Sequence, residues 1–168
     1  MRPMMRPMMR PMMLADVEEV SRIEQAVQAY PWTRGNFTDA MTNHYECSVD
    51  ATSAGIRGYA IWMPILEEAE LLNIGVAEVW QRKGLGRAML SGMLESARKK
   101  NMRRVFLEVR VSNVAAIALY HAVGFARIGE RRGYYQHANR SENALVMACD
   151  LNPHLLSAHA EKRVYAKA

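Results

Sequence analysis

Apolar residues recur at helical spacing near the start of the chain and in strand-like runs further along. The first helical set follows residue 16: Val17, Val20, Ile23, Ala26 and Val27. This spacing predicts a helix that Asp16 caps and that ends near Ala29. Pro31 interrupts the pattern, and Thr33 can cap a second short helix that reaches about Thr42.

The remaining apolar runs predict seven strands and two further helices. Residues 10–13 enter the first strand, and six more follow at 45–50, 56–66, 69–76, 104–110, 125–134 and 142–149. Pro64 lies inside a strand pattern and indicates an edge or a bulge, and Glu67 and Glu68 lie in the turn after that strand. Helical spacing predicts helices over 85–100 and 113–122. This order of elements is typical of a mixed α/β fold.

Length and repeats divide the chain into one domain with two short extensions. Residues 1–12 are three copies of Met-Arg-Pro-Met, and a proline in every copy cannot sustain a helix or a ladder strand. We therefore expect residues 1–9 to form a disordered leader and residues 10–150 to form one domain. Residues 151–168 are expected to be a basic C-terminal tail.

Composition excludes several classes of protein. No apolar run approaches the roughly 20 residues of a membrane span. The N-terminal charges are not followed by the apolar core of a signal peptide. Cys47 and Cys149 show neither disulfide nor metal spacing, so we expect two buried free thiols and no metal. These features predict a cytoplasmic protein.

The net charge of +5 hides a strong division along the chain. Residues 14–80 hold eleven acidic and three basic side chains, whereas residues 81–150 hold five acidic and thirteen basic ones. The basic half suits a polyanion such as a CoA-type cofactor, and the acidic half suits a cationic partner. The alternative is an uneven distribution by chance. A surface for nucleic acid would not need the acidic half.

The stretch from Leu71 to Arg87 places a strand, a basic glycine-bearing turn and a helix in succession. Gly84 and Gly86 let the backbone approach an anion closely, and the helix N-terminus adds partial positive charge. Three side chains supply charged donors that suit a pyrophosphate: Arg82, Lys83 and Arg87. The alternative is an ordinary turn with a solvated basic rim. The spacing fits neither a P-loop nor a dinucleotide fingerprint, but it matches Q/R-x-x-G-x-G/A.

Two polar residues in apolar surroundings are candidates for acid–base chemistry. Glu108 lies within the strand 104–110, where it either faces solvent or serves as a general base in a cleft. Tyr120 follows Asn113 by about two helical turns. It is either a core residue or a proton donor to a leaving thiolate. The periodicity by itself leaves both alternatives open.

These segments together resemble the GNAT acyl-CoA N-acetyltransferases. The turn at residues 81–87 carries the first half of the likeness, and the pattern Asn113-(x)3-Ile117-Ala118-Leu119-Tyr120-(x)3-Gly124-Phe125 carries the second. Shorter segments resemble one branch, the RimI-type ribosomal-protein alanine N-acetyltransferases: Leu14-Ala15-Asp16, Tyr30-Pro31-Trp32, Glu70-Leu71-Leu72-Asn73-Ile74, Leu107-Glu108-Val109-Arg110 and Arg131-Arg132-Gly133-Tyr134-Tyr135. The likeness covers roughly residues 10–150.

The resemblance implies a mixed seven-stranded sheet, flanked by about four helices and splayed between its fourth and fifth strands around acetyl-CoA. It implies that Glu108 is the base, that Tyr120 is the acid, and that the backbone N–H of Val76 polarises the thioester carbonyl. The residues implied to bind acetyl-CoA are Ile74, Gly75, Val76, Arg82, Lys83, Gly84, Leu85, Gly86, Arg87 and Asn113. The implied acceptor is the N-terminal alanine of a basic small-subunit ribosomal protein. The residues expected to contact it are Trp32, Glu67, Glu68, Tyr134 and Tyr135.

Two departures from the family pattern bear on the acceptor more than on the chemistry. The chain reads Glu142-Asn143-Ala144 where the family commonly has Glu-Asp-Ala, and it carries both terminal extensions. The alternatives are a GNAT enzyme that acetylates a small amine or a lysine side chain, and a non-catalytic acyl-CoA-binding protein. The retention of Glu108 and Tyr120 speaks against the second. We expect a monomer or weak dimer with no direct contact to nucleic acid or membrane.

Overall fold

The computed structural model describes residues 6–137 and 140–151, so the expected leader up to residue 5 and the tail from residue 152 lie outside the described residues. The helices are α1 (Val17–Val27), α2 (Arg34–Thr42), α3 (Leu85–Lys99) and α4 (Val114–Ala122), with the 3-10 turns η1 (Leu14–Asp16) and η2 (Glu78–Trp80). The strands are β1 (Met9–Pro11), β2 (Glu46–Thr52), β3 (Gly55–Ile65), β4 (Glu68–Val76), β5 (Arg104–Arg110), β6 (Ala126–His137) and β7 (Arg140–Asp150).

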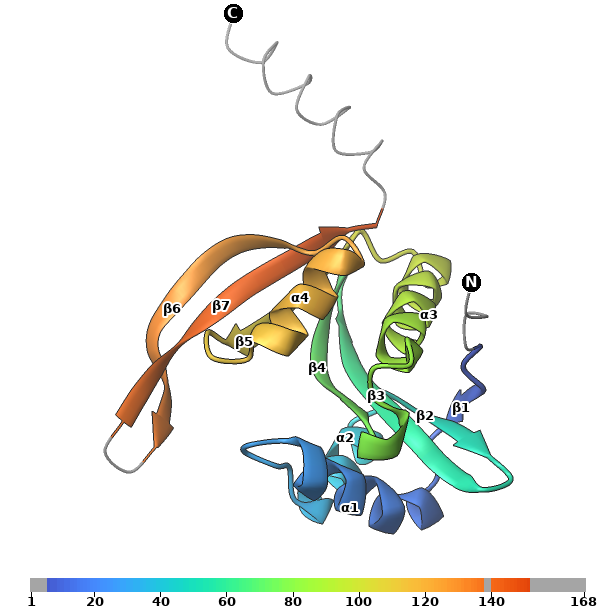
Figure 1. Ribbon diagram of the computed structural model, residues 1–168. Coiled ribbons are helices and arrows are strands. Elements are labelled where there is room, and N and C mark those ends of the chain that lie inside the picture. The colour runs from blue at the N-terminus through green and yellow to red at the C-terminus, as the bar shows by residue number, and fades with distance from the viewer. Residues whose placement is uncertain (1–5, 138–139, 152–168) are drawn as a thin grey trace, which may run out of the picture.

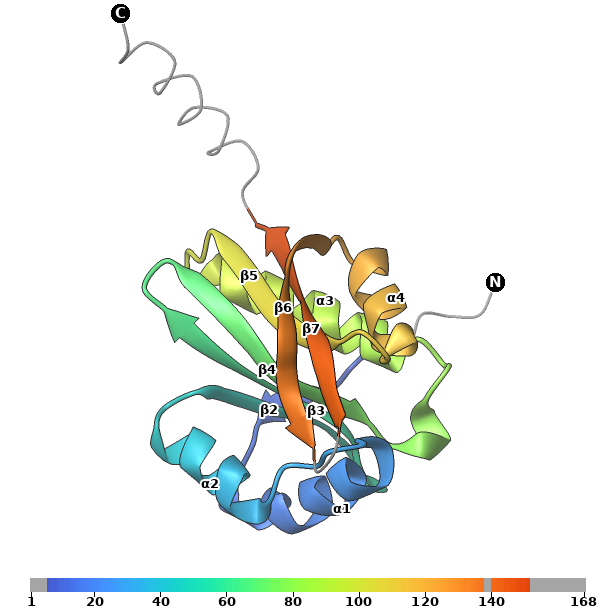
Figure 2. The ribbon, with the colours of Figure 1, turned by 90° about the vertical axis from the view of Figure 1, so that its left-hand side faces the viewer.

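The strands form one mixed sheet in the order β1-β2-β3-β4-β5-β7-β6. All neighbours are antiparallel except β4 and β5, which are parallel and are connected through η2 and α3. Figure 1 shows the β6–β7 hairpin at one end of the sheet and β1 at the other, and Figure 2 views the sheet from the hairpin end. The seven strands and four helices found among the described residues confirm the expected architecture.

The parallel pair β4–β5 separates after only three residue pairs. Glu68, Ala69 and Glu70 pair with residues 104–106, but both strands continue well beyond that point. A bulge in β4 lies next to the separation, because Leu71 and Asn73 face consecutive residues of β3. The sheet is therefore splayed between its fourth and fifth strands, as the family resemblance implies.

Two hydrophobic clusters cover the two faces of the sheet. One joins α3 and α4 to β5 and β7, and includes Trp62, Leu90 and Leu107. The other joins α1 and α2 to β2 and β3, and includes Phe37 and Ile61. Ile61 and Trp62 are neighbours in β3 and enter different clusters, as expected for a strand buried on both faces. The first cluster also spans the splay, because it contains Leu71 of β4 as well as Leu107 of β5.

Local features differ from the expected ones in two places, whereas Pro64 takes the expected edge position. Asp16 stands at the start of α1, but its side chain accepts from the backbone N–H of Met13 and pairs with Arg10 instead of capping that helix. β1 begins at Met9, inside the expected leader, because its backbone pairs with β2. Pro64 lies beyond the end of β2, so only β4 borders it and no ladder bond is lost.

Among the described residues, no helix has both the length and the apolar character needed to cross a membrane.

Candidate active site

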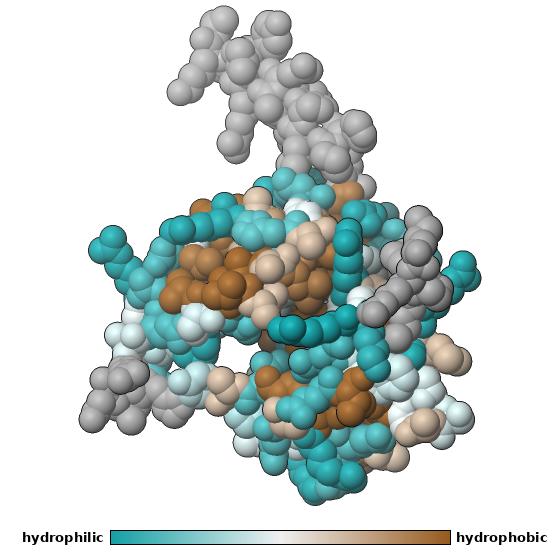
Figure 3. Space-filling model, in the orientation of Figure 1, coloured by the Kyte–Doolittle hydropathy of each residue, from teal (hydrophilic) through white to brown (hydrophobic). Residues whose placement is uncertain are grey.

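A cavity of about 950 Å³ occupies the gap between the splayed strands. Its walls come from the end of α1 and the loop after it, the second half of β4, the turn before α3, β5, α4 and the β6–β7 hairpin. Figure 3 shows the surface hollowed between the part that carries α4 and the part that carries α1. Twelve of the seventeen residues predicted for the site line this cavity: Trp32, Ile74, Gly75, Val76, Arg82, Gly84, Gly86, Arg87, Glu108, Asn113, Tyr120 and Tyr135.

The backbone of β4 presents hydrogen-bonding groups to this gap. The N–H of Ala77 donates to the carbonyl of Arg57 at 2.9 Å. This bond establishes which residues of β4 form hydrogen bonds with β3. In an antiparallel ladder the bonding direction alternates, so Ile74 and Val76 direct their N–H and C=O groups away from β3. The free edge of β4 can therefore bind an extended ligand as a neighbouring strand would.

Two glutamine side chains already bond to this free edge. Gln28 Nε2 donates to the Ile74 carbonyl at 3.2 Å, and Gln81 Nε2 donates to the Val76 carbonyl at 2.9 Å. Neither glutamine was among the predicted site residues. Their contacts leave the N–H groups of Ile74 and Val76 directed into the cavity, which suits the pantetheine amides and thioester oxygen of acetyl-CoA.

Packing of β4 against Tyr59 of β3 requires a glycine at position 75. A Cβ atom at this position would clash with the hydroxyl oxygen of Tyr59. Tyr59 is fully buried, so it has no space to withdraw. The absence of a side chain at Gly75 therefore allows β4 to lie directly against the buried tyrosine.

The turn before α3 is shaped for an anion. Arg82 and Gly84 both have positive φ values, 57° and 83°, and α3 starts at the next residue. The first intrahelical bond of α3 runs from the N–H of Ala88 to the carbonyl of Gly84, so the N–H groups of residues 85–87 have no partner within the helix. Because Arg87 also lines the cavity, this end of the site fits the pyrophosphate of acetyl-CoA.

Two predicted cofactor residues do not line the cavity. Leu85 is fully buried, and only its backbone belongs to the open helix end. Lys83 places its ammonium 4.9 Å from the ring centroid of Trp80. Asn113 does line the cavity, but its side chain also caps α4 by accepting from the N–H of Ala116 at 3.2 Å. Its position at the site is therefore set by a structural role in the helix.

Glu108 lies on the face of β5 that points away from the α3–α4 cluster. Its side chain is 16% exposed, and Arg131 Nη1 stands 3.0 Å from its Oε1. The hydrogen bond and negative charge of Glu108 raise the pKa of Tyr134. The neighbouring carboxyl of Glu70 has a pKa raised by burial and by the charge of Glu108, partly offset by Arg131. Glu108 therefore belongs to a cluster of interacting side chains that includes Arg131, Tyr134 and Glu70, and the cavity extends to this cluster.

Tyr120 enters the cavity from α4 and packs against Phe125, with ring centroids 5.7 Å apart. Burial, together with the nearby hydroxyl of Tyr135, raises the pKa of Tyr120 to about 12. Its phenol therefore stays protonated at neutral pH, as a proton donor must. Tyr120 is both a core residue and a residue of the cavity wall.

The structure does not bring all predicted acceptor residues to the cavity. Glu67 and Glu68 lie at the other end of β4, about 26 Å along the strand from Val76 at 3.3 Å per residue. Glu67 forms an exposed ion pair with Arg103 at 3.1 Å. Tyr134 is exposed beside the cavity-lining Tyr135, their rings 5.1 Å apart.

A buried carboxylate that the sequence analysis missed, Glu24, also belongs to the cavity lining. Glu24 of α1 is 1% exposed and accepts hydrogen bonds from the N–H of Trp32 at 2.7 Å, from Asn73 Nδ2 at 3.1 Å, and from the hydroxyl of Tyr59. Burial and the charge of Glu24 raise the pKa of Tyr59. A charge within the apolar helical spacing of Val20 and Val27 is the signal that could have identified Glu24.

An arginine stack that sequence reasoning also missed spans the open end of the cavity. The guanidinium of Arg110 lies 3.7 Å from the ring centroid of Tyr30 and 3.8 Å from that of Tyr135. Glu142 accepts from Arg110 Nη1 at 3.4 Å and from the N–H of Ser112 at 2.8 Å. The stack joins the α1–α2 loop to the β6–β7 hairpin, which lie on opposite sides of the splay.

Asn143, the departure from the family pattern, has a defined role in this hairpin. Its Oδ1 accepts from the N–H of Gly133 at 2.9 Å, and its Nδ2 donates to Glu130 Oε1 at 2.6 Å. An aspartate in this place could not donate to Glu130. The asparagine therefore stabilises the irregular part of β6, where Gly133 has a φ of 58°.

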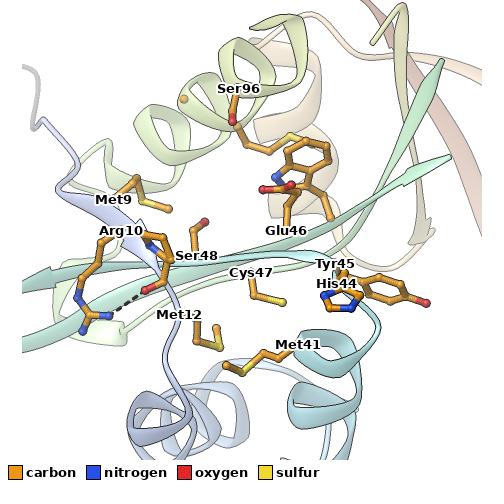
Figure 4. Close-up of a pocket in the computed structure, with 14 residues that line it drawn as sticks. Met9, Arg10, Met12, Met41, His44, Tyr45, Glu46, Cys47, Ser48 and Ser96 are labelled. Carbon is orange, nitrogen blue, oxygen red and sulfur yellow. Dashed lines mark hydrogen bonds between the residues drawn. The ribbon is translucent and has the colours of Figure 1, made fainter. Parts of the chain in front are cut away.

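A second cavity, of about 530 Å³, lies between β1, β2 and α3. Figure 4 shows Met12, Met41 and Cys47 on one side of it. Burial and the charge of Glu46 raise the pKa of Cys47 to about 11, so its thiol is protonated at neutral pH and is a poor nucleophile. Glu108 and Tyr120, the predicted acid–base residues, line the first cavity instead.

The large cavity therefore combines an anion-binding turn, free backbone donors, a carboxylate and a protonated phenol. This set can hold a CoA thioester, remove a proton from an amine and protonate a thiolate. The arrangement is that of an acyl-transfer site.

Comparison with known proteins agrees with this geometry. The model of the Acetyltransferase (GNAT) family matches residues 14–125. The [Ribosomal protein bS18]-alanine N-acetyltransferase of Escherichia coli K12 is 36% identical over 137 residues, covering 82% of this chain and 93% of the relative. The enzyme of the same name from Haemophilus influenzae is 34% identical over 137 residues, covering 81% and 93%.

A solved structure shows the same fold. The crystal structure of the ribosomal-protein-S18-alanine N-acetyltransferase from Escherichia coli superposes with a TM-score of 0.79 at 34% identity, covering 85% of this chain and 92% of that one. The family match, the sequence relatives and the shared fold lead to one conclusion: this chain belongs to the GNAT family of acetyltransferases.

Proposed function

We propose that this protein transfers the acetyl group of acetyl-CoA to the N-terminal α-amine of a protein, an alanine at the start of a small-subunit ribosomal protein. The observation that carries the proposal is that one cavity contains Glu108, Tyr120 and the free N–H groups of Ile74 and Val76. The relatives named for acetylation of ribosomal protein bS18 support this acceptor. Such an acceptor places the reaction in the cytoplasm, where ribosomes are made.

In this proposal acetyl-CoA supplies an activated acetyl thioester, and the chain supplies binding and proton transfer. The free edge of β4 and the turn before α3 hold the cofactor. An N-terminal amine is largely an ammonium ion at neutral pH, and it must lose a proton before it can attack. Glu108 accepts that proton and passes it to water. Tyr120 donates its proton to the departing thiolate and regains one from the nitrogen that has formed the amide.

Incubation with acetyl-CoA and three peptides tests this function. One peptide begins with alanine and continues with a basic sequence, the second has the same sequence with a blocked N-terminus, and the third has its only free amine on a lysine side chain. Mass spectrometry should find acetylation of the first peptide alone. Acetylation of the third would favour a lysine acetyltransferase, and binding of acetyl-CoA without turnover would favour a non-catalytic acyl-CoA-binding protein.

A further inference from the structure

The carboxylate assigned as the general base is already paired with a cation of the same chain. Arg131 reaches from the edge strand β6 to Glu108 on β5, with 3.0 Å between Nη1 and Oε1. The two partners differ in exposure, since the Glu108 side chain is 16% exposed and that of Arg131 is 56% exposed. The base is therefore held in place, whereas the arginine has room to move.

An acceptor amine that approaches Glu108 enters the space around the carboxylate where Arg131 lies. A proton passes from an ammonium group to Glu108 when the nitrogen is within hydrogen-bond distance of a carboxylate oxygen or is joined to it by one water. A guanidinium and an ammonium on one half-buried carboxylate repel each other, because solvent screens them weakly there. Arg131 and the acceptor therefore compete for Glu108.

Glu70 offers Arg131 a second position nearby. Glu70 of β4 pairs with Phe106 of β5 in the parallel part of the sheet. Glu108 follows Phe106 by two residues, so Glu70 and Glu108 lie on the same face of the sheet. Its half-buried carboxylate interacts electrostatically with both Glu108 and Arg131. A small displacement of the exposed Arg131 side chain can therefore move its ion pair from Glu108 to Glu70.

We propose that Arg131 is a displaceable counter-ion. It pairs with Glu108 in the free enzyme, moves to Glu70 when the acceptor ammonium arrives, and returns to Glu108 when the product is neutral. This inference rests on the proposed function. Acetylation converts a cationic amine into an uncharged amide, so the product can no longer compete for Glu108 once that carboxyl has lost its proton to water. Return of Arg131 then favours release of the acetylated N-terminus.

The test compares Arg131→Gln with Arg132→Gln, its exposed neighbour on β6, because both variants remove one positive charge from the same strand. With the alanine peptide, Arg131→Gln should lower the acceptor KM severalfold more than Arg132→Gln does. It should also strengthen inhibition by the acetylated peptide and leave the KM for acetyl-CoA unchanged. Circular dichroism and the Tm verify that both variants are folded.

Glu70→Gln supplies the second arm of the test. It should raise the acceptor KM in the wild-type background, because Arg131 loses its alternative position, and have no such effect in the Arg131→Gln background. If Arg131→Gln raises the acceptor KM or matches Arg132→Gln, the inference is wrong while α-amine acetylation by the wild type stands. If the wild type acetylates no α-amine, the proposed function and the inference both fail.

Discussion

Asn73 of β4 donates a hydrogen bond from Nδ2 to Oε1 of Glu24 on α1, at a distance of 3.1 Å. This bond joins the lobe that carries α1 to the strand whose free edge faces the cavity. Because Glu24 is 1% exposed and also bonds to Tyr59 and to the backbone of Trp32, the position of β4 depends on a buried network.

Replacing Glu24 with glutamine should destabilise the protein by about 1–3 kcal/mol. In the glutamine variant, an amide NH2 group would replace one of the two carboxylate oxygens that now accept hydrogen bonds. At least one buried donor would then lose its acceptor. Urea unfolding measures the loss, and Glu18→Gln is the control, since Glu18 is exposed and its ion pairs contribute little. Equal stability of the two variants would contradict the role assigned to Glu24.

Replacing Glu108 with glutamine should lower turnover about 10²–10⁴-fold while acetyl-CoA affinity stays unchanged, because only proton transfer is removed. The loss should diminish above about pH 8, where most of the acceptor amine is already neutral. Steady-state kinetics across pH, together with calorimetric binding of acetyl-CoA, test both statements. Glu95→Gln, on the exposed face of α3, is the control. Loss of cofactor binding in Glu108→Gln would show a structural role.

Tyr120→Phe should lower turnover with little change in Tm. The ring keeps its contact with Phe125, and only the proton donor is lost. Because the pKa of Tyr120 is about 12, any fall in wild-type rate between pH 8 and about pH 10 must come from another group. Single-turnover kinetics that isolate the chemical step provide the measurement, and an unchanged rate would remove Tyr120 from the mechanism.

Replacing each of two glycines with alanine should change the stability of the protein in opposite directions. Gly75→Ala should destabilise by about 1–3 kcal/mol, because the new Cβ meets the buried Tyr59 hydroxyl. Gly92→Ala, in the middle of α3 where a Cβ meets nothing within 4 Å, should stabilise by about 0.5–1 kcal/mol. Thermal unfolding distinguishes the two, and a destabilised Gly92→Ala would show that the space beside α3 is occupied.

The Arg10–Asp16 pair predicts a pH dependence of stability. The hydrogen bond from Arg10 lowers the pKa of Asp16, and burial opposes it only partly. The stabilisation is therefore present above the unfolded pKa of about 3.9, and it is lost as pH falls through the lower folded value. Asp16→Asn should lower the Tm at pH 7, and the gap to wild type should close below about pH 4. Asp39→Asn, at an exposed position, should show no such gap.

Features that depend on neighbouring residues could be read from the sequence. Thr33 caps α2 by accepting from the N–H of Asn36, as its position before the helix predicts. Gly84 provides the left-handed residue before α3, and apolar spacing and capping residues predict the four helices of the described chain. The motif at residues 81–87 and the resemblance carried by Glu108 and Tyr120 name residues that line one cavity. These properties arise within one or two turns of chain, so one sequence contains them.

Contacts between distant segments were decided only by the tertiary structure. The network of Glu24, the stack on Arg110 and the pair between Arg131 and Glu108 each join elements far apart in the chain. Glu67, which is expected to contact the acceptor, precedes the end of β4 that is remote from the cavity. Periodicity tells which face a side chain occupies, but not which strand lies opposite or where the sheet opens. Those relationships depend on how the lobes pack, because packing determines which charges are brought together and partly removed from water.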